Sequence, residues 1–255
     1  MRMSGNTILI TGGGSGIGRA LAHRFHGFGN TVIIAGRRME ALQEAVGKRP
    51  HMHAMTVDIE NPKSVADFAE RLLADYPQLN ILVNNAGIMR FEALDRSRDL
   101  VDAEATISTN LLGPIRLTDA LIEHLSAQNG ATIINVSSGL AFVPLAAAPT
   151  YCATKAAIHS YTVAMREALA GHVEVLELVP PLVQTELTPG QSTRVGPLSL
   201  DEFIDEVMDL FQEQPTPCEI IVARAEFQRH AEAEHRFDEA VTILNARDRE
   251  SRVGA

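Results

Sequence analysis

The feature of this sequence that most limits its fold is a regular alternation of short apolar runs with segments of helical periodicity. The runs are five to seven residues long and rich in Ile and Val. Between them, apolar residues recur at intervals of three and four, the period of a helix that packs on one face. Parallel strands need such crossover helices, which then cover both faces of the sheet. We therefore expect a doubly wound, Rossmann-type α/β fold with a seven-stranded parallel sheet, its strands at 7–11, 31–35, 53–57, 81–85, 132–136, 173–179 and 219–223.

The connecting segments carry their own start signals and apolar faces. After the first strand, Leu21 and Phe25 lie four residues apart and would share one helix face. After the third strand, Asn61 is a suitable helix cap and Pro62 suits the first turn of the helix. These signals agree with the alternation of strands and helices.

No internal repeat or low-complexity tract divides the chain, so we expect a single dinucleotide-binding domain over residues 1–255. One stretch resists a regular interpretation. Residues 187–199 are rich in Pro, Gly, Ser and Thr and follow the sixth strand directly. They predict a mobile substrate loop at about 182–199.

Composition and charge exclude several classes of function. Apolar residues make up 45% of the chain, which is enough for a substantial core. The formal net charge of -10, with no dense Lys/Arg run, argues against a nucleic-acid partner. No signal peptide is apparent, and no apolar run reaches the roughly 20 residues that span a bilayer. We expect a cytoplasmic protein without a membrane partner. The two cysteines lack ligand spacing, so no metal is expected.

A glycine cluster, TGGGSGIG at 11–18, follows the first strand and opens the first helix. Gly12 would allow a sharp turn, Gly16 a close approach to a pyrophosphate, and Gly18 tight packing of the helix on the sheet. The helix N-terminus would offer unpaired N–H groups to phosphates. A flexible turn is the alternative. The cluster favours a dinucleotide cofactor.

The end of the second strand reads AGRR (35–38), without the carboxylate that would bind the ribose 2′-hydroxyl of NAD. Gly36 leaves room there, and Arg37 and Arg38 could pair with a 2′-phosphate. NADP(H) is therefore expected in preference to NAD(H). Two solvated arginines at the start of a helix are the alternative interpretation.

Tyr151 and Lys155 in YCATK are four residues apart, so in a helix their side chains leave the same face one turn apart. Such spacing is common by chance on helix surfaces. It becomes informative beside other motifs, namely NNAG (84–87), Asn110 and Ser138. Together with TGGGSGIG, these motifs resemble the short-chain dehydrogenase/reductase family over nearly the whole chain. The segments NVSSGLAFVPLA (135–146) and PTYCATKAAIHSYT (149–162) are further similar to its DltE-like oxidoreductase subgroup.

The resemblance implies that Tyr151 is the general acid/base and Lys155 its partner, with Ser138 holding the substrate oxygen and Asn110 ordering a water. Physical chemistry supports this division. A phenol titrates near 10, and a neighbouring ammonium together with the positive ring of oxidised nicotinamide favours its ionised form, which would lower the pKa of Tyr151. Ser138 could stabilise a developing alkoxide. For Asn110, a local backbone bond inside a helix is the alternative.

The resemblance also assigns cofactor contacts. Lys155 would bind the nicotinamide ribose and Asp58 the adenine edge, although Asp58 is equally well explained as a turn residue. The family usually has Pro-Gly after the sixth strand, whereas here Pro180 is followed by Pro181, which puts the closure of the loop in doubt. The full set of predicted cofactor residues is Gly12, Ser15, Gly16, Ile17, Gly18, Arg37, Arg38, Asp58, Ile59, Asn84, Ala86, Gly87, Tyr151, Lys155, Pro181, Val183 and Thr185.

The predicted function is hydride transfer between NADP(H) and a small carbonyl or secondary alcohol, as in a carbonyl reductase or alcohol dehydrogenase. The apolar stretch 139–149 favours an apolar or cyclic substrate, unless it packs the core or a subunit contact. Arg90 could meet an anionic substituent or remain solvated. A regulator that binds NADP(H) without catalysis is the alternative function. The resemblance further implies a homodimer or homotetramer, through helices starting near Glu104 and Thr150.

Overall fold

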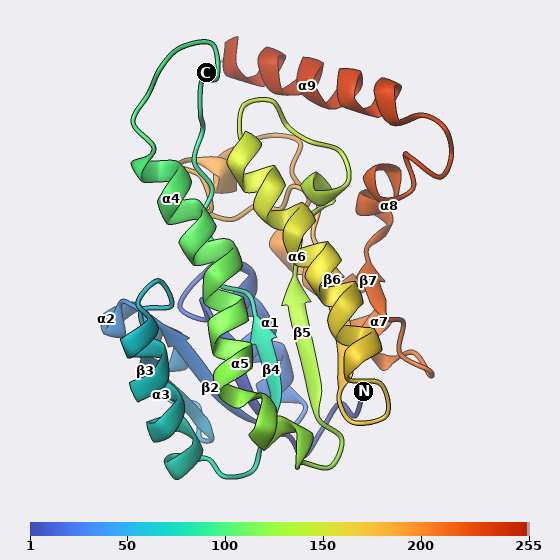
Figure 1. Cartoon of the computed structure of the whole chain (residues 1–255). Helices are drawn as coiled ribbons and strands as arrows, with labels where there is room; N and C mark the ends of the chain where they lie inside the picture. Colours follow the sequence, from blue (N-terminus) through green and yellow to red (C-terminus); the bar gives the residue numbers. More distant parts are fainter. Residues whose placement is uncertain (254–255) are drawn as a thin grey trace.

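A computed structural model describes residues 1–253, with side chains described as far as Glu250. Its centre is a parallel sheet of seven strands in the order β3-β2-β1-β4-β5-β6-β7 (Figure 1). The predicted doubly wound sheet is therefore confirmed, with strand ends that differ by a few residues. The strands are β1 (Thr7–Thr11), β2 (Thr31–Gly36), β3 (Met52–Thr56), β4 (Leu79–Asn84), β5 (Thr132–Val136), β6 (Glu174–Val179) and β7 (Glu219–Ile221).

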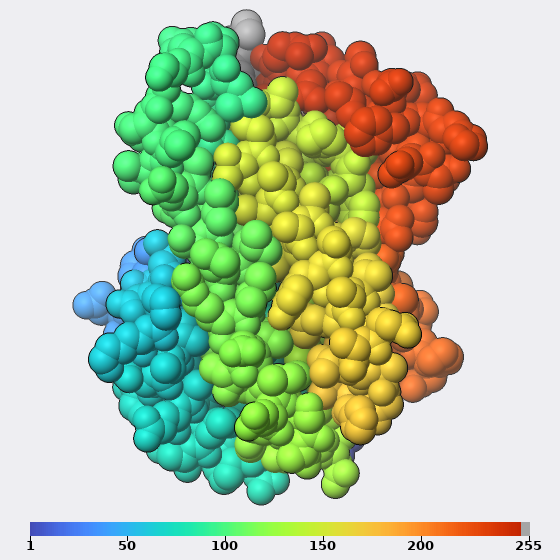
Figure 2. Space-filling model, viewed as in Figure 1, coloured from blue at the N-terminus to red at the C-terminus, as the bar shows by residue number. Residues whose placement is uncertain are grey.

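Helices cover the sheet in two layers. One layer consists of α1 (Gly16–Gly27), α2 (Met39–Val46) and α7 (Leu200–Gln212). The opposite layer consists of α3 (Pro62–Asp75), α5 (Gly113–Ser126) and α6 (Pro149–Ala168), which form the face seen in Figure 2. Each layer has its own apolar core against the sheet.

Successive side chains along each strand point to opposite faces of the sheet and so contribute to both cores. In β1, Ile8 and Ile10 pack toward α1, whereas Leu9 packs toward α3 and α5, and all three are fully buried. The helix faces follow the predicted period, with Leu21 and Phe25 of α1 buried. Burial on both sides explains why these strands are continuously apolar.

The cap predicted at the start of α3 is present. The Asn61 side chain accepts hydrogen bonds from the backbone N–H groups of Lys63 and Ser64, and Pro62 occupies the first turn. The N-terminal N–H groups of the helix are thereby satisfied locally.

The direction of winding reverses between β1 and β4, which are neighbours in the sheet although β2 and β3 lie between them in sequence. Crevices form outside the carboxyl ends of strands at such a reversal, because the flanking crossovers leave in opposite directions. In Figure 1, β5 points toward the upper end of the view, where the chain adds elements beyond the sheet. These are α4 (Val101–Ile107), a π-helical turn (Ser108–Leu112), two 3₁₀ turns (Gly139–Ala141 and Gln191–Thr193), α8 (Ala223–Arg229) and α9 (Phe237–Val253).

The acidic segment at residues 225–237, whose i,i+4 charge pairs are typical of a helix, is not one continuous helix, because α8 ends at Arg229 and α9 begins at Phe237. Between them, His235 has φ of 57°, a left-handed conformation that a helix cannot contain. Within residues 1–253, no helix is both long and apolar enough to cross a membrane.

Candidate functional site

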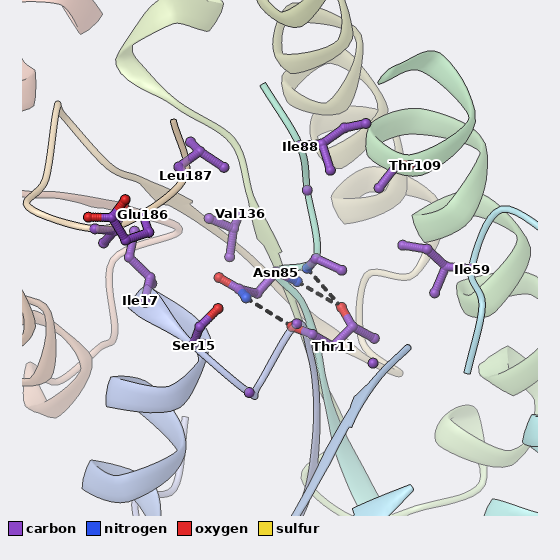
Figure 3. Close-up of a pocket in the computed structure, with 18 of the residues that line it drawn as sticks. Thr11, Ser15, Ile17, Ile59, Asn85, Ile88, Thr109, Val136, Glu186 and Leu187 are labelled. Atoms are coloured by element: carbon purple, nitrogen blue, oxygen red, sulfur yellow. Dashed lines mark hydrogen bonds between the residues drawn. The ribbon is translucent and has the colours of Figure 1, made fainter. Parts of the chain in front are cut away.

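A cavity of about 600 Å³ lies at the carboxyl ends of the central strands (Figure 3). The glycine turn forms one wall, and the segments after β3, β4, β5 and β6 form the others. Most of the predicted cofactor residues line it. Those on the cavity wall are Gly12, Ser15, Gly16, Ile17, Gly18, Arg37, Arg38, Asp58, Ile59, Ala86, Gly87, Tyr151, Lys155, Pro181, Val183 and Thr185.

The glycine turn needs glycine for two different reasons. Gly12 and Gly16 have φ of 68° and 51°, in the left-handed region that side chains disfavour. Gly18 has ordinary torsions, but a Cβ atom there would lie 2.4 Å from the Asn85 side chain and 2.5 Å from the Gly12 carbonyl. Gly13 was missed by sequence reasoning, and a Cβ atom there would lie 2.5 Å from Ile34. The first two glycines shape the turn, and the other two bring helix and strands together.

The segment after β4 is locked to the turn. The Thr11 hydroxyl accepts hydrogen bonds from the backbone N–H groups of Asn85 and Ala86, both 3.0 Å, and Asn85 Nδ2 donates to the Thr11 carbonyl at 2.9 Å (Figure 3). Asn85 also lines the cavity. Hydrogen bonds between side chains and backbone therefore fix the glycine turn and the segment after β4 relative to each other.

Asn84, predicted to border the cofactor, does not line the cavity. Its side chain is buried inside the sheet layer, where Nδ2 donates to Asn135 Oδ1 at 2.9 Å and to Thr118 Oγ1 at 3.1 Å. Successive strand residues point to opposite sides, so the neighbour Asn85 reaches the crevice instead. These bonds join β4 to β5 and α5, so Asn84 stabilises the central sheet.

The arginine predicted for a 2′-phosphate has a carboxylate partner that the sequence pattern did not reveal. Arg37 Nη1 lies 3.0 Å from Glu60 Oε1, and the same oxygen accepts a hydrogen bond from Thr109 Oγ1 at 2.8 Å. Glu60 is further fixed because Arg116 donates to its carbonyl at 2.9 Å. Glu60 comes from the segment after β3, so no motif at the end of β2 could have indicated it.

Asp58 has the turn role that was one of its two interpretations, and its contact with the adenine edge stays a prediction. Its carboxylate accepts a hydrogen bond from the backbone N–H of Glu60 at 3.1 Å, which is a turn role. It also lines the cavity beside Ile59, whose side chain packs where a Cβ atom of Gly113 would lie. The turn presents Asp58 and Ile59 to the crevice.

Tyr151 and Lys155 are on one face of α6, and both are almost fully buried in the cavity wall. The Lys155 ammonium lies 5.7 Å from the centre of the Tyr151 ring. Lys155 Nζ donates a hydrogen bond to the Val136 carbonyl at 2.8 Å, at the end of β5. The helix and the strand end therefore fix the ammonium next to the phenol.

Burial governs the acid/base properties of this pair in the protein alone. It raises the pKa of Tyr151 to about 12, and a hydrogen bond with Ser138 lowers it only in part. Burial lowers the pKa of Lys155 to about 8, while the charge of Glu177 raises it. The lowering of the Tyr151 pKa that we expect from Lys155 together with oxidised nicotinamide stays a prediction.

Ser138 and Ser137 both reach the cavity wall, but their hydroxyl groups differ. Ser137 Oγ donates to the Leu178 carbonyl at 3.4 Å. Ser138 Oγ accepts from the Leu140 N–H at 3.1 Å, so its own hydroxyl proton remains available. Only Ser138 forms a side-chain hydrogen bond with Tyr151. This matches the choice of Ser138 from the sequence.

Asn110 is buried in the π-helical turn and does not itself line the cavity. Its Oδ1 accepts from the Ile88 N–H and its Nδ2 donates to the Ile88 carbonyl, both at 2.8 Å, while Nδ2 also donates to Thr154 Oγ1 at 3.3 Å. These partners are distant in sequence, so the alternative of a local backbone bond is wrong. Asn110 ties the cavity wall at Ile88 to α6.

An apolar cluster adjoins the Tyr151 end of the cavity. It contains Met89, Leu140, Leu145, Leu187 and, from α9, Leu244, packed around Tyr151 and Cys152. Arg90 lines the cavity nearby, with its Nε 3.5 Å from Asp102 Oδ1. Apolar surface therefore surrounds the phenol, and the arginine beside it already faces a carboxylate.

The first turn of α6 is held by a carboxylate from the segment after β4. Buried Glu92 accepts hydrogen bonds from the Thr150 N–H and the Thr150 hydroxyl, both at 2.9 Å, and pairs with Arg98 at 2.8 Å. A negative charge is favourable at a helix N-terminus. This contact fixes the residue directly before Tyr151, and no motif predicted it.

The expected loop after β6 is irregular in structure but well connected. Leu198 closes its base, because its N–H donates to the Leu182 carbonyl at 2.9 Å and its carbonyl accepts from the Gln184 N–H at 2.8 Å. Inside the loop, buried Gln191 donates to the Val183 carbonyl at 2.8 Å. Pro180 and Pro181 line the cavity at the start of this segment. Figure 3 shows Glu186 and Leu187 opposite the glycine turn.

A glycine-lined helix N-terminus at the sheet reversal, facing a cavity of nucleotide size, defines a dinucleotide-binding α/β protein. The comparisons with known proteins agree. The model of the short chain dehydrogenase family matches residues 6–195. The chain therefore belongs to the short chain dehydrogenase family of oxidoreductases.

Individual relatives extend this match. The chain is 40% identical over 220 residues to the uncharacterized oxidoreductase DltE of Bacillus subtilis (strain 168), covering 84% of this chain and 87% of that protein. A short chain dehydrogenase from Burkholderia cenocepacia J2315 in complex with NADP has a TM-score of 0.79 at 27% identity, covering 97% and 98% of the two chains. A 3-ketoacyl-(acyl-carrier-protein) reductase from Brucella melitensis complexed with NADH has a TM-score of 0.77 at 26% identity, covering 88% and 100%.

Proposed function

We propose that the protein is an NADP(H)-dependent carbonyl reductase or alcohol dehydrogenase in which Tyr151 transfers the proton. One observation carries the proposal. A phenol and an ammonium, both buried, face the same cavity one helical turn apart, and a serine hydroxyl forms a hydrogen bond with the phenol.

The cavity fits a dinucleotide on its own geometry. Gly12 and Gly16 bend the backbone so that the first turn of α1 opens into the cavity, and side chains at these positions would enter strained torsions. The phosphates would bind at the α1 N-terminus, and Lys155 would contact the ribose at the other end. The bound nicotinamide would exchange a hydride with the substrate carbon.

The residues of the chain supply the remaining chemistry. In the reductive direction, Tyr151 donates its hydroxyl proton to the substrate oxygen, which becomes the alcohol. Its pKa of about 12 keeps that proton in place at neutral pH. The Ser138 hydroxyl donates a hydrogen bond to the same oxygen and so stabilises the developing negative charge. The Lys155 ammonium stabilises the phenolate that Tyr151 becomes.

NADP(H) is favoured over NAD(H) because Arg37 and Arg38 line the adenine-ribose end of the cavity. Arg37 has a side chain that is 59% exposed and pairs with Glu60. Such an exposed ion pair contributes only about 0–1 kcal/mol, so it gives way readily to a phosphate. We further propose an apolar or cyclic carbonyl substrate, because the cluster around Tyr151 is apolar.

Ketone reduction by purified protein tests the proposal. With NADPH and a panel of cyclic and aryl ketones, the absorbance of NADPH should fall, and Tyr151→Phe should reduce kcat by about 100- to 10,000-fold, since it removes the general acid. NADPH binding should remain within a few-fold, measured by titration. Tight NADPH binding without turnover on a broad panel, or full activity of Tyr151→Phe, would overturn it.

A further inference from the structure

A buried carboxylate lies behind the phenol and ammonium, outside the cavity. Glu177, in the middle of β6, has 0% of its surface exposed. Its Oε2 accepts a hydrogen bond from His159 Nδ1 at 2.8 Å, and its Oε1 has no hydrogen-bond partner among the described residues. Burying a carboxylate is costly unless charge or hydrogen bonds compensate it. A feature of this kind calls for a functional explanation.

The position of Glu177 links it to Lys155. On α6, Lys155 and His159 are four residues apart and so leave the same face in successive turns. Lys155 Nζ bonds the carbonyl of Val136, which pairs in register with Leu178, the residue after Glu177. Successive turns of α6 therefore place an ammonium and an imidazole over the same stretch of β5 and β6.

The other charges around Glu177 have partners of their own. Glu219 on β7 is in register with Glu177, but Arg229 of α8 donates to both of its oxygens, at 2.7 and 3.0 Å. Arg166, further along α6, donates to the carbonyls of Val175 and Cys218. Among the described residues, the Glu177 carboxylate has a hydrogen-bond partner in His159 alone, and His159 loses its positive charge as the pH rises.

A divalent cation explains the cluster less well. Ligand atoms of His159, Glu177 and Glu219 lie within 4.8 Å of one another. However, Arg229 occupies both oxygens of Glu219 and adds a positive charge to the position that a cation would need. The two carboxylates, Glu177 and Glu219, are already balanced by Arg229 and by one further positive charge once His159 or Lys155 is protonated.

We propose that Glu177 is the buried counter-charge that keeps Lys155 protonated, and that His159 holds its carboxylate in place. Glu177 does not line the cavity, so it is a positioning residue that acts through Lys155. The inference rests on the proposed function, which assigns Lys155 to the reaction.

The electrostatics have the required sign. Burial lowers the pKa of Lys155 to about 8, and the charge of Glu177 is the one influence that raises it. Removal of that charge therefore lowers the pKa further and makes Lys155 neutral at a lower pH. Burial raises the pKa of Tyr151 to about 12, so Lys155 is the member of this pair whose pKa lies between pH 7 and 10. We therefore expect an alkaline loss of reductase activity in that range to report on Lys155.

The test is the pH profile of kcat for ketone reduction in wild type, Glu177→Gln and Glu219→Gln. Both variants replace a carboxylate of the same cluster with an amide of equal size. Glu177→Gln should move the alkaline limb to lower pH by about one unit or more, the usual effect of losing one nearby charge. Glu219→Gln should leave the limb in place. An unmoved limb in Glu177→Gln, or equal displacement in both variants, would overturn the proposal.

Two further measurements keep the outcome decisive. If Glu177→Gln does not fold, His159→Gln with Glu177→Gln replaces the pair by two amides that can bond each other, and the same downward displacement is expected. NADPH affinity against pH gives a readout independent of turnover, because Lys155 faces the cofactor cavity. A wild type that binds NADPH without turnover would refute the proposed function. The pH at which NADPH affinity changes, compared between wild type and Glu177→Gln, would still decide the role of Glu177.

Discussion

Replacement of Arg37 by aspartate should separate the two nicotinamide cofactors. Arg37 lines the cavity, is mostly exposed and, within the part of the chain that the structure describes, forms an ion pair with Glu60 alone. A hydrogen bond between charged groups contributes about 1.5–3 kcal/mol. Its loss from a 2′-phosphate corresponds to a weakening of NADPH binding by about 10- to 150-fold, because 1.4 kcal/mol equals a factor of ten. NADH lacks that phosphate, so its affinity should change less than about threefold.

Titration of both cofactors against wild type and variant measures the effect. Arg24→Asp is the matched control, since Arg24 is a similarly exposed arginine, pairs with Asp205 and does not line the cavity. It changes the net charge by the same amount and should affect neither cofactor. Glu60→Gln should strengthen NADPH binding by up to about fivefold, because the competing ion pair contributes about 0–1 kcal/mol. Equal losses of NADPH and NADH affinity in Arg37→Asp would refute the reasoning.

Two further predictions concern stability. Gly18→Ala should cost about 1–3 kcal/mol in chemical denaturation, because its Cβ would lie 2.5 Å from the Gly12 carbonyl and force the helix off the turn; wild-type stability would contradict the packing role. His159→Leu should cost roughly 3–5 kcal/mol, because it leaves the Glu177 carboxylate unpaired. Hydrogen bonding to Glu177 raises the pKa of His159, so this cost should be largest below about pH 6.5 and fall as the pH rises through that raised pKa. A cost that grows with pH would exclude the ion pair.

The sequence predicted the sheet and most of the cavity because their signals are local. Continuous apolar strands, the glycine turn and the spacing of Tyr151 and Lys155 each follow from neighbouring residues. The direction in which the Asn84 side chain points was missed, because it depends on which residue ends the strand. A shift of one residue exchanges the inward and outward side chains.

The remaining features depend on contacts between distant segments. Glu60 meets Arg37, and Glu177 meets His159, only after the parallel sheet brings their strands and helices together. The degree to which burial raises the pKa of Tyr151 is likewise a property of the folded chain. Charge patterns in a single sequence carry no signal for either effect.

The contact of Glu92 with the first turn of α6 has a consequence for redesign. Glu92 accepts hydrogen bonds from Thr150 and forms an ion pair with Arg98. Both ends of the span between residues 92 and 98 are therefore fixed beside the helix that carries Tyr151. Grafting or shortening the tip at residues 93–97 should therefore leave the phenol undisturbed. Libraries that keep Glu92 and Arg98 could therefore vary residues 93–97, which do not line the cavity that contains Tyr151, without loosening the start of α6.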